Sequence, residues 1–426
     1  MKSKLQLNLI TPLENYLSKV KAFRPNARLY LLTVIITGTA LGIFRLLQNF
    51  YVLSLGFDEA LLGKLITTNS LTALIVALPV GYLGDLLGRK KSLILGGLLI
   101  SLSVIGMVIW PMVSVFYALS VMRGFAQSLR GITMAPFLME NSGEEERTYL
   151  FSFGMGLTTL SGFAGNWIGG YLPTWLGTQL GVSATSSTAY GAAIAIMAVL
   201  FGLGTIPLLF ISRNKLGTDE RSVFAPVRFI LDHPGLVGKL VGPMLITALG
   251  AGLVMPFMNV FFRTVHNQSD QVIGSLFAWG SLAMGLGLLI APALAERFGK
   301  IQVVVFTQGL SVPFLIILGF APAFWMSASA YYVRLALMNM STPIYETFVM
   351  EQVDPSSRAL VASLTSMSWS FGWAFSPSIS GSLQVNYGFG PPFLGTITLY
   401  IIAISLIWVF FWKNKGVSVQ VPKSKP

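Results

Sequence analysis

Apolar runs of roughly 20 residues recur along the whole length of this chain, and each run can cross a bilayer of about 30 Å as a helix. Backbone groups inside hydrocarbon must bond to one another, so such runs fold as helices. Of the 426 residues, 54% are hydrophobic and only 10% are charged, whereas a soluble domain carries about 25% charged residues. The sequence therefore predicts an all-α integral protein of the cell membrane.

Twelve of these runs are predicted to be transmembrane helices. Their approximate ranges are 29–53, 61–84, 92–112, 114–138, 149–173, 187–212, 237–262, 271–295, 301–323, 325–350, 358–384 and 390–412. With both termini in the cytoplasm, 22 of the 28 lysines and arginines fall on the cytoplasmic side, which cations in membrane proteins prefer. Only Arg263 falls in a predicted outer loop. The net charge of +12 is therefore a topology signal, and no nucleic-acid partner is predicted.

Several classes of site are missing from the sequence. The chain has no cysteine, and its two histidines, His233 and His266, stand alone in predicted loops. Disulfides and thiolate metal sites are therefore excluded, and no metal site or cofactor is predicted. The chain also lacks the G-x-x-x-x-G-K-[ST] pattern of a nucleotide-driven pump and the H-E-x-x-H and G-x-S-x-G patterns of hydrolytic enzymes. We therefore predict neither a pump nor an enzyme.

The two halves of the chain repeat each other at an offset of 211 residues. The stretch GYLGDLLGRKK from Gly81 and the stretch PALAERFGK from Pro292 share the order acid-x-x-Gly-cation, so Asp85 aligns with Glu296. The same offset aligns Gly63 with Gly274, Asp58 with Ser269, Gln48 with Asn259, Arg123 with Arg334, Glu140 with Glu351, and Arg147 with Arg358. Such repeats build many secondary transporters, whose substrate site lies between the halves.

The repeat gives a domain organisation. Two pseudo-symmetric six-helix bundles are predicted over residues 29–212 and 237–413. A basic, partly amphipathic segment (1–28) precedes them on the cytoplasmic face, a charged linker (213–236) joins them, and a short cytoplasmic tail (414–426) follows. One such chain is sufficient for transport, so a monomer is expected.

The stretch from Gly81 to Lys91 resembles the loop 2–3 signature of the major facilitator superfamily, and the stretch from Pro292 to Lys300 resembles its weaker copy in loop 8–9. Leu86 stands where the family usually has a cation, and Pro292 replaces the leading glycine of the second copy. The resemblance covers essentially the whole chain. It implies twelve helices in two bundles and transport by a rocking of one bundle against the other.

Charged residues and glycines at the predicted cytoplasmic ends are interpreted as a gate. Gly81 has no side chain, so a helix of the other half can approach it closely, and Asp85 would face the positive N-terminus of that helix. Arg89 and Lys90 could pair with acids of loop 4–5. The residues assigned to this gate are Gly81, Asp85, Gly88, Arg89, Lys90, Glu140, Arg147, Glu296, Arg297, Gly299, Lys300, Glu351 and Arg358. A static positive-inside anchor is the alternative.

Ionisable residues inside spans cost about 2.5–3.5 kcal/mol each on insertion scales, so each needs a partner or a watery cavity. The repeat predicts that Arg123 with Gln48 recurs as Arg334 with Asn259, which favours a scaffold role. Arg123 also resembles the family's fourth-helix arginine, so a coupling role stays open. The candidates for the substrate cavity or for coupling are Arg45, Gln48, Arg123, Gln127, Arg130, Asn259, Arg334, Asn339 and Glu346.

Three of these candidates have no counterpart in the other half: Arg45, Arg130 and Glu346 align with Pro256, Ser341 and Ala135. Because the fold's repeat does not demand them, they are the favoured functional residues. Glu346 could pair with Arg130 across the cavity or bind and release a proton. Alternatively, Glu346 is solvated in the cytoplasmic last turns of its helix, near Glu351.

The fifth span contains Gly165-Asn166-x-x-Gly169-Gly170, which resembles the Gly-Pro-x-x-Gly-Gly motif of the family's antiporters, with Asn166 in place of proline. Its counterpart in the eleventh span keeps Pro377 and Gly381. Small residues also permit close helix packing in any membrane protein. The motif supports an exporter more weakly than the intact pattern would.

Together these features predict a secondary transporter that moves a small organic solute, with proton-coupled efflux favoured. Four arginines at Arg45, Arg123, Arg130 and Arg334 would make the cavity electropositive, so an anionic or amphiphilic solute is expected. The expected partners are the solute, protons and membrane lipids. An uncoupled facilitator, a proton-coupled importer and a transporter-like sensor without flux are the alternatives.

Overall fold

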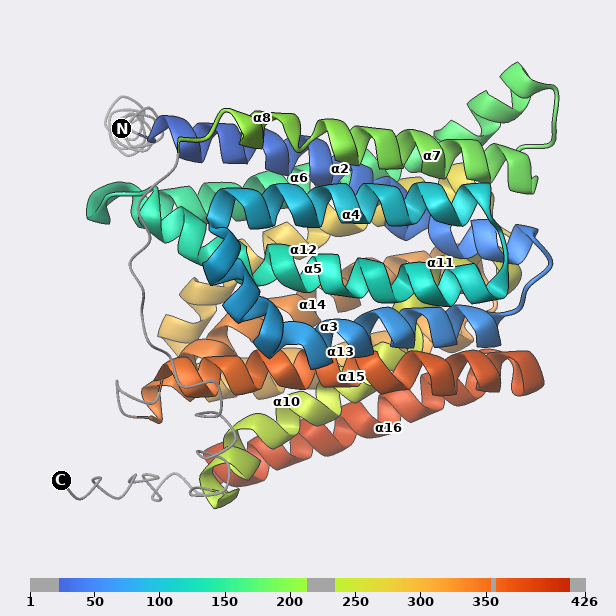
Figure 1. Cartoon of the computed structure of the whole chain (residues 1–426). Helices are drawn as coiled ribbons and strands as arrows, with labels where there is room; N and C mark the ends of the chain where they lie inside the picture. Colours follow the sequence, from blue (N-terminus) through green and yellow to red (C-terminus); the bar gives the residue numbers. More distant parts are fainter. Residues whose placement is uncertain (1–22, 213–233, 354–357, 414–426) are drawn as a thin grey trace, which may run out of the picture.

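The computed structural model describes residues 23–212, 234–353 and 358–413, and every regular element in these ranges is a helix (Figure 1). Each predicted span overlaps one long helix. The long helices are α2 (Pro25–Ser54), α3 (Glu59–Leu87), α4 (Arg89–Ile109), α5 (Val113–Glu140), α6 (Glu144–Leu180), α7 (Ser187–Leu203), α10 (Pro234–Val254), α12 (Asp270–Phe298), α13 (Lys300–Phe320), α14 (Phe324–Glu351), α15 (Arg358–Tyr387) and α16 (Gly390–Ile407). The predicted all-helical membrane fold is therefore confirmed.

Short helices extend three of the long ones. They are α8 (Ile206–Leu209) after α7, η1 (Met255–Phe257) and α11 (Met258–Thr264) after α10, and η2 (Trp408–Lys413) after α16. Most of the predicted N-terminal segment 1–28, most of the linker 213–236 and the tail 414–426 lie outside the described residues.

Among the described residues, eight helical segments are long and apolar enough to cross a membrane by length and composition alone. They comprise α2, part of α3, α4, α7 with α8, α10 through α11, α12, α13, and α16 with η2. The helices α5, α6, α14 and α15 are equally long but more polar. For example, α5 carries Arg123 and Arg130, and α14 carries Arg334. Polar faces in a membrane must be covered by protein or face water, so these helices contribute to the interior.

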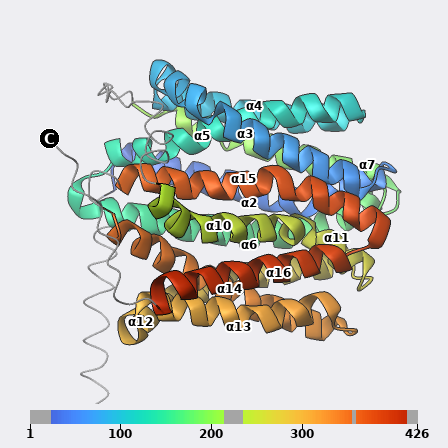
Figure 2. The ribbon, with the colours of Figure 1, turned by 90° about the horizontal axis from the view of Figure 1, so that it is seen from below.

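The helices form two bundles that lie side by side. In the first half α2 packs on α6 and α7, and α5 packs on α3 and α4; in the second half α10 packs on α15 and α16, and α14 packs on α12 and α13. The longest contacts between the halves are those of α3 with α15 and of α6 with α12, and α11 also packs against α2. Figures 1 and 2 show the blue-to-green half and the yellow-to-red half with their helix axes roughly parallel.

The hydrophobic core is shared by both halves at one end of the molecule and divided at the other. One buried cluster combines first-half residues such as Phe50 and Tyr190 with second-half residues such as Phe257. Two further clusters stay within a single half, one around Val304 and one around Phe137. The shared end holds the loops 55–58 and 265–269, predicted to lie outside, and we call it the outer end; the opposite end is the inner end.

Matching residues of the repeat have matching structural roles. Gly88 joins α3 to α4 with φ 78° and ψ 155°, and Gly299 joins α12 to α13 with φ 92° and ψ 147°. Side chains other than hydrogen rarely tolerate this conformation. At the outer end, Asp58 Oδ1 accepts a hydrogen bond from the Leu61 amide at 2.8 Å, and Ser269 Oγ accepts one from Val272 at 3.5 Å, so both cap a helix N-terminus. The offset of 211 is therefore structural.

Candidate functional site

Small residues seal the outer end between the halves. A Cβ placed on Gly274 of α12 would lie 2.6 Å from the backbone oxygen of Asn166 in α6, and one on Gly63 of α3 would overlap the oxygen of Pro377 in α15. The offset of 211 relates these two contacts exactly, since it pairs Gly63 with Gly274 and Asn166 with Pro377. The helices cross at backbone contact, which only glycine allows.

The predicted helix-packing residues all lie at such crossings. Gly165 and Gly169 of α6 face α2, where a Cβ on Gly169 would lie 3.2 Å from the Cα of Ile43. Gly170 faces α12, and Gly381 faces the start of α3. This motif therefore holds α6 between its own half and the other half, which is the packing role that small residues have in membranes.

A buried ion pair reinforces the outer seal. Arg263 of α11 lies 3.3 Å from Asp270 Oδ1 of α12, and the Tyr190 hydroxyl of α7 donates to Asp270 Oδ2 at 2.6 Å. Arg263 also donates to the Tyr190 hydroxyl and stacks on Phe50 of α2 at 4.3 Å from the ring centre. Asp270 is only 7% exposed. Because a buried charge needs partners, this cluster fixes the first half against the second.

A second polar link lies beside the first. Asn49 of α2 donates to Asn259 Oδ1 at 2.9 Å and to the Pro256 carbonyl at 2.8 Å, and Asn259 donates back to the Leu46 carbonyl at 2.7 Å. Nearby, His266 packs against Phe261 and other aromatic rings in the loop before α12. Burial lowers the pKa of His266, so the imidazole adds no cation beside Arg263.

Ion pairs at the inner end stay within each half. Arg89 Nε lies 3.0 Å from Glu140 Oε1 in the first half, and Lys300 pairs with Glu351 in the second. The offset of 211 relates these pairs residue for residue. In the part of the chain that the structure describes, no ion pair at this end joins the two halves.

The remaining predicted gate residues also contact their own half. Lys90 Nζ donates to the carbonyls of Leu209 and Ile211 at 2.6 and 2.9 Å. Arg147 donates to Ser142 Oγ at 3.4 Å, and Arg358 donates to the Met350 carbonyl at 3.1 Å. Glu296 and Arg297 are exposed at the end of α12. The side chain of Asp85 lies outside the described residues.

The expected close approach at Gly81 is not found. A Cβ on Gly81 would meet only Ile132 of its own half, at 4.0 Å. Figure 1 shows the reason: the last turns of α3, which contains Pro79, bend away from α15 toward α4. The halves are therefore closed at the outer end and parted at the inner end, which is an inward-facing arrangement if the predicted topology holds.

The predicted contact between Arg123 and Gln48 is present. Arg123 is buried and donates to Gln48 Oε1 at 3.1 Å, with Phe44 4.8 Å away in cation–π geometry. With the Asn69 amide oriented to satisfy its neighbours, its oxygen accepts from Arg123 Nε at 3.3 Å and its nitrogen donates to Gln127 Oε1 at 3.0 Å. This network ties α5 to α2 and α3, as the scaffold interpretation expects.

The second-half counterpart differs from the prediction. Arg334 is 2% exposed and donates to the Tyr400 hydroxyl at 3.0 Å, with Met255 Sδ at 3.2 Å, and it does not contact Asn259. The reason is that α10 ends before Pro256 and α11 restarts the helix, which turns Asn259 toward the first half. Asn339 donates to the Leu335 carbonyl of its own helix at 2.8 Å.

The expected pairing of Arg130 with Glu346 is also absent. Arg130 packs inside the first half, 3.5 Å from Thr37 Oγ1 and 4.8 Å from the ring centre of Phe201. Glu346 is exposed in the second half, five residues before Glu351 near the inner end of α14. Each side chain is held on its own bundle, so the two charges do not meet. This placement matches the solvated alternative for Glu346.

Arg45 is the exception among the in-span arginines. Its side chain is exposed although its neighbours Phe44 and Leu46 are buried, and it makes no hydrogen bond or ion pair with the described part of the chain. Arg45 lies one turn inward of Asn49 on the same face of α2, and Asn49 contacts the other half. Arg45 therefore lies just below the outer seal, between the halves.

The sequence does not predict the outer ion pair. It places Arg263 in a loop, and Asp270 and Tyr190 lie at the starts of two helices 80 positions apart. One sequence signal could have directed attention to Asp270: the offset of 211 aligns it with Glu59, so each half has an acid directly after its N-cap.

Known proteins resemble this chain along most of its length. The Multidrug resistance protein MdtG of Dickeya zeae (strain Ech586) is 26% identical over 394 residues, which cover 88% of this chain and 91% of that protein. MdtG of Proteus mirabilis (strain HI4320) is 24% identical over 344 residues, or 78% and 81% of the two chains.

Solved structures of other transporters have the same fold. The nucleoside transporter NupG has a TM-score of 0.73 at 14% identity, covering 92% of this chain and all of that chain. A bacterial homolog of the human lysosomal transporter Spinster, in an inward-facing and unoccupied conformation, has a TM-score of 0.71 at 13% identity, covering 90% and 95%. The family model of the Major Facilitator Superfamily matches residues 30–244 and 240–426. This multi-pass membrane transporter therefore belongs to the Major Facilitator Superfamily.

Proposed function

We propose that this chain is a proton-coupled exporter of small organic solutes that works as a monomer by rocking its two bundles. The observation that carries the proposal is Arg45, an exposed and unpaired cation beneath a sealed outer end. A solute arriving from the cytoplasm through the parted inner end would reach this guanidinium. The name of the MdtG relatives, multidrug resistance protein, supports efflux as the direction.

The charges around this position favour a solute with an anionic or electron-rich group. Arg123, Arg130 and Arg334 contact amide, hydroxyl, thioether or aromatic groups, and none of them pairs with a carboxylate in the described ranges. Their positive charge is therefore not neutralised locally, and a cavity of one sign attracts the opposite charge. Arg45 has a free planar donor fork, which binds carboxylate or phosphate groups well.

Transport in proteoliposomes that contain a pH-sensitive dye tests this function. Organic anions, lipophilic cations and neutral drugs are compared with and without a proton gradient, for wild type, Arg45→Gln and Glu346→Gln. The control is Arg24→Gln, which removes an exposed cation at the start of α2. We expect Arg45→Gln to lower anion transport about tenfold, since a charge-assisted hydrogen bond is lost, with the control unchanged. An equal loss for anions, cations and neutral drugs would contradict the anion preference.

The same measurement decides on proton coupling. Solute-evoked proton flux that Glu346→Gln abolishes would support coupling through that carboxylate, and its sign gives antiport or symport. The second candidate function is an uncoupled facilitator, favoured by the exposed position of Glu346 near the inner end. Gradient-independent solute flux that is unchanged in Glu346→Gln would establish the facilitator and remove the coupling claim.

A further inference from the structure

A cavity of about 420 Å³ opens between α6, α12 and α14, and none of its lining residues belongs to α2, the helix of Arg45. Its walls include the rings of Tyr171, Trp279, Phe324 and Tyr332, together with Ser275. Tyr171 and Trp279 are 46% and 52% exposed. On α12 the cavity residues share a face with the exposed apolar residues Leu286, Leu289 and Ile290 farther along the helix. Large apolar side chains that are exposed on a membrane-spanning helix suit contact with lipid, so we assign this face to the lipid side.

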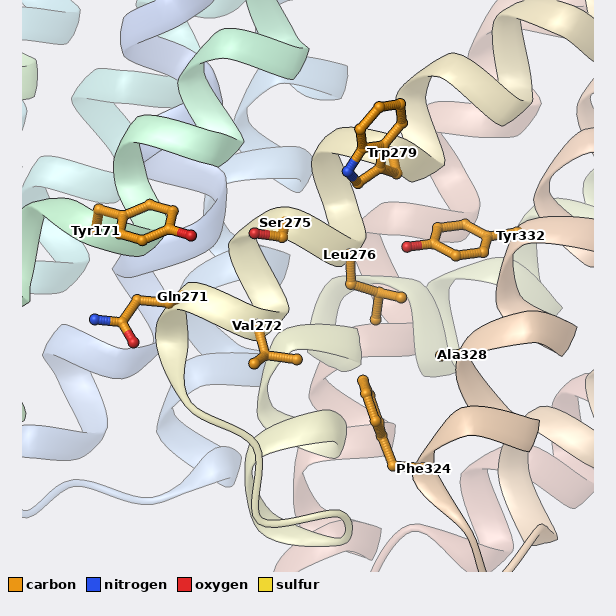
Figure 3. Close-up of a pocket in the computed structure, with 9 residues that line it drawn as sticks. All are labelled: Tyr171, Gln271, Val272, Ser275, Leu276, Trp279, Phe324, Ala328 and Tyr332. Carbon is orange, nitrogen blue, oxygen red and sulfur yellow. The ribbon is translucent and has the colours of Figure 1, made fainter.

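Four residues with hydrogen-bonding side chains, Tyr171, Ser275, Trp279 and Tyr332, line this cavity. Figure 3 shows the hydroxyls of Tyr171 and Ser275 turned toward each other, and the hydroxyl of Tyr332 turned toward α12 from the other side. None of the four side chains makes a hydrogen bond with another part of the described chain. Polar groups without partners are costly next to hydrocarbon, so this space favours a polar occupant over an apolar one.

The cavity lies at the boundary between the lipid headgroups and the hydrocarbon core. The 29 residues of α12 span about 43 Å, whereas the hydrocarbon core is about 30 Å thick, so each helix end extends several ångströms beyond hydrocarbon. Ser275 lies about 8 Å along α12 from Asp270 at the outer end. Tyrosine and tryptophan are also the residues that membrane proteins place at this interface.

The lining selects the charge of the occupant. None of the nine lining residues is charged, so an anionic headgroup finds no cation to pair with. Four aromatic rings instead offer negative π faces, which attract an ammonium group, and the hydroxyls and the indole N–H can donate to phosphate or ester oxygens. A zwitterionic headgroup satisfies both sets of groups.

We propose that this cavity binds the headgroup of a zwitterionic phospholipid of the outer leaflet. Its acyl chains would run toward the bilayer centre along Leu286, Leu289 and Ile290, which continue the same face of α12 in that direction. The lipid would rest against the junction of the halves, because the Gln271 side chain at the rim donates to Thr174 Oγ1 of α6 at 3.0 Å. This site is separate from the proposed solute pathway.

Native mass spectrometry of the purified protein tests the site. Phosphatidylethanolamine and phosphatidylglycerol with identical acyl chains are titrated, and the affinity of the first bound lipid is compared. We expect phosphatidylethanolamine to bind more tightly, and Trp279→Leu to weaken it about fivefold, since one cation–π wall is lost. The matched control Trp325→Leu removes an indole that is 69% exposed on α14 outside the cavity and should leave binding unchanged.

A second variant keeps the test decisive if Trp279→Leu does not fold. Ser275→Phe retains the indole and fills the cavity, so it should also remove the preference for phosphatidylethanolamine. Equal affinity for the two lipids in wild type, or equal effects of Trp279→Leu and Trp325→Leu, would overturn the proposal. Binding of tetraphenylphosphonium at this site without competition from phosphatidylethanolamine would also overturn it, in favour of a lipophilic cation.

Discussion

At the residue scale, the carboxylate of Asp270 takes part in polar contacts that join the two halves. Asp270 belongs to the second half, and its partners Tyr190 and Arg263 come from both halves. Its repeat counterpart Glu59 is only partly buried and is not part of an ion pair among the described residues. Asp270 therefore acts as a lock that the pseudo-symmetry of the fold does not require.

Removing this charge should open the outer end. In Asp270→Asn the amide can still accept from Tyr190, but Arg263 loses its counter-charge, which should destabilise the sealed state by roughly 1–3 kcal/mol, since Arg263 is partly exposed. The chain has no native cysteine. A single Leu46→Cys stands at a fully buried position whose backbone carbonyl accepts from Asn259 of the other half, so it reports on access from outside. A membrane-impermeant reagent should alkylate the cysteine at position 46 about fivefold faster when Asp270→Asn is present than when it is absent.

The matched control for this variant is Glu59→Gln, which removes the corresponding acid of the first half. Its alkylation rate should equal that of the otherwise unmodified Leu46→Cys protein. If Glu59→Gln and Asp270→Asn speed alkylation equally, loss of a helix-terminal charge explains both results and the lock assignment is wrong.

Sequence reasoning found some contacts at this scale and missed others for a physical reason. Arg123 with Gln48 could be predicted because both lie in unbroken helices, where spacing fixes direction. The same argument fails for Arg334 and Asn259, because the helix is interrupted between α10 and α11 by the short turn Met255–Phe257, which contains Pro256. A proline does not reveal this in advance: Pro79 and Pro377 remain inside their helices. The cluster around Asp270 forms only because three helices pack together. The spacing of residues along the chain does not predict that packing.

At the element scale, the sharp joints at Gly88 and Gly299 direct consecutive helices back across the membrane. Both glycines are predicted members of a charged gate, but their positive φ gives them a role that does not depend on charge. The predicted spans also fell short of the helices, since 149–173 lies within Glu144–Leu180. Hydropathy marks only the part of a helix inside hydrocarbon, so ends that continue into the interface were missed.

Gly88→Ala should strain the joint between α3 and α4. A residue with a Cβ in this region of φ and ψ costs roughly 1–3 kcal/mol, so thermal unfolding in detergent should shift to lower temperature. The control is Gly238→Ala within α10, where a Cβ would meet no atom within 4 Å and alanine favours helix by about 0.5–1 kcal/mol. Equal melting temperatures for the two variants would show that the conformation of Gly88 is not limiting.

At the scale of the whole molecule, the repeat of 211 residues explains both what was predictable and what was not. From the repeat the two bundles could be predicted, and the structure has matching contacts in the two halves. The repeat could not predict which end of the molecule is closed, because a sequence with two equivalent halves carries residues that can close either end. Which end is closed follows from Asp270, Asn259 and the glycine crossings of the outer end, together with the bend of α3.

If the halves rock as rigid bodies, opening the outer end must close the inner end. The contacts Gly63 with Pro377 and Glu59 with Gly381 define an antiparallel register between α3 and α15. Extended inward, this register brings Tyr82 next to Arg358, two exposed residues. In the double variant Tyr82→Cys, Arg358→Cys, the distance between the two spin labels should therefore be long. The same distance should be shorter when Asp270→Asn is added.

The two ends give independent readouts of one variant, so their combination is decisive. A shorter inner distance together with faster alkylation at Leu46→Cys supports a rocking motion, because one substitution at the outer end then moves both ends in opposite directions. Faster alkylation with an unchanged inner distance would show that the outer seal opens locally, while the bend of α3 stays as it is. In that case Asp270 would hold only the outer helix ends, and alternating access would need a different element to close the inner end.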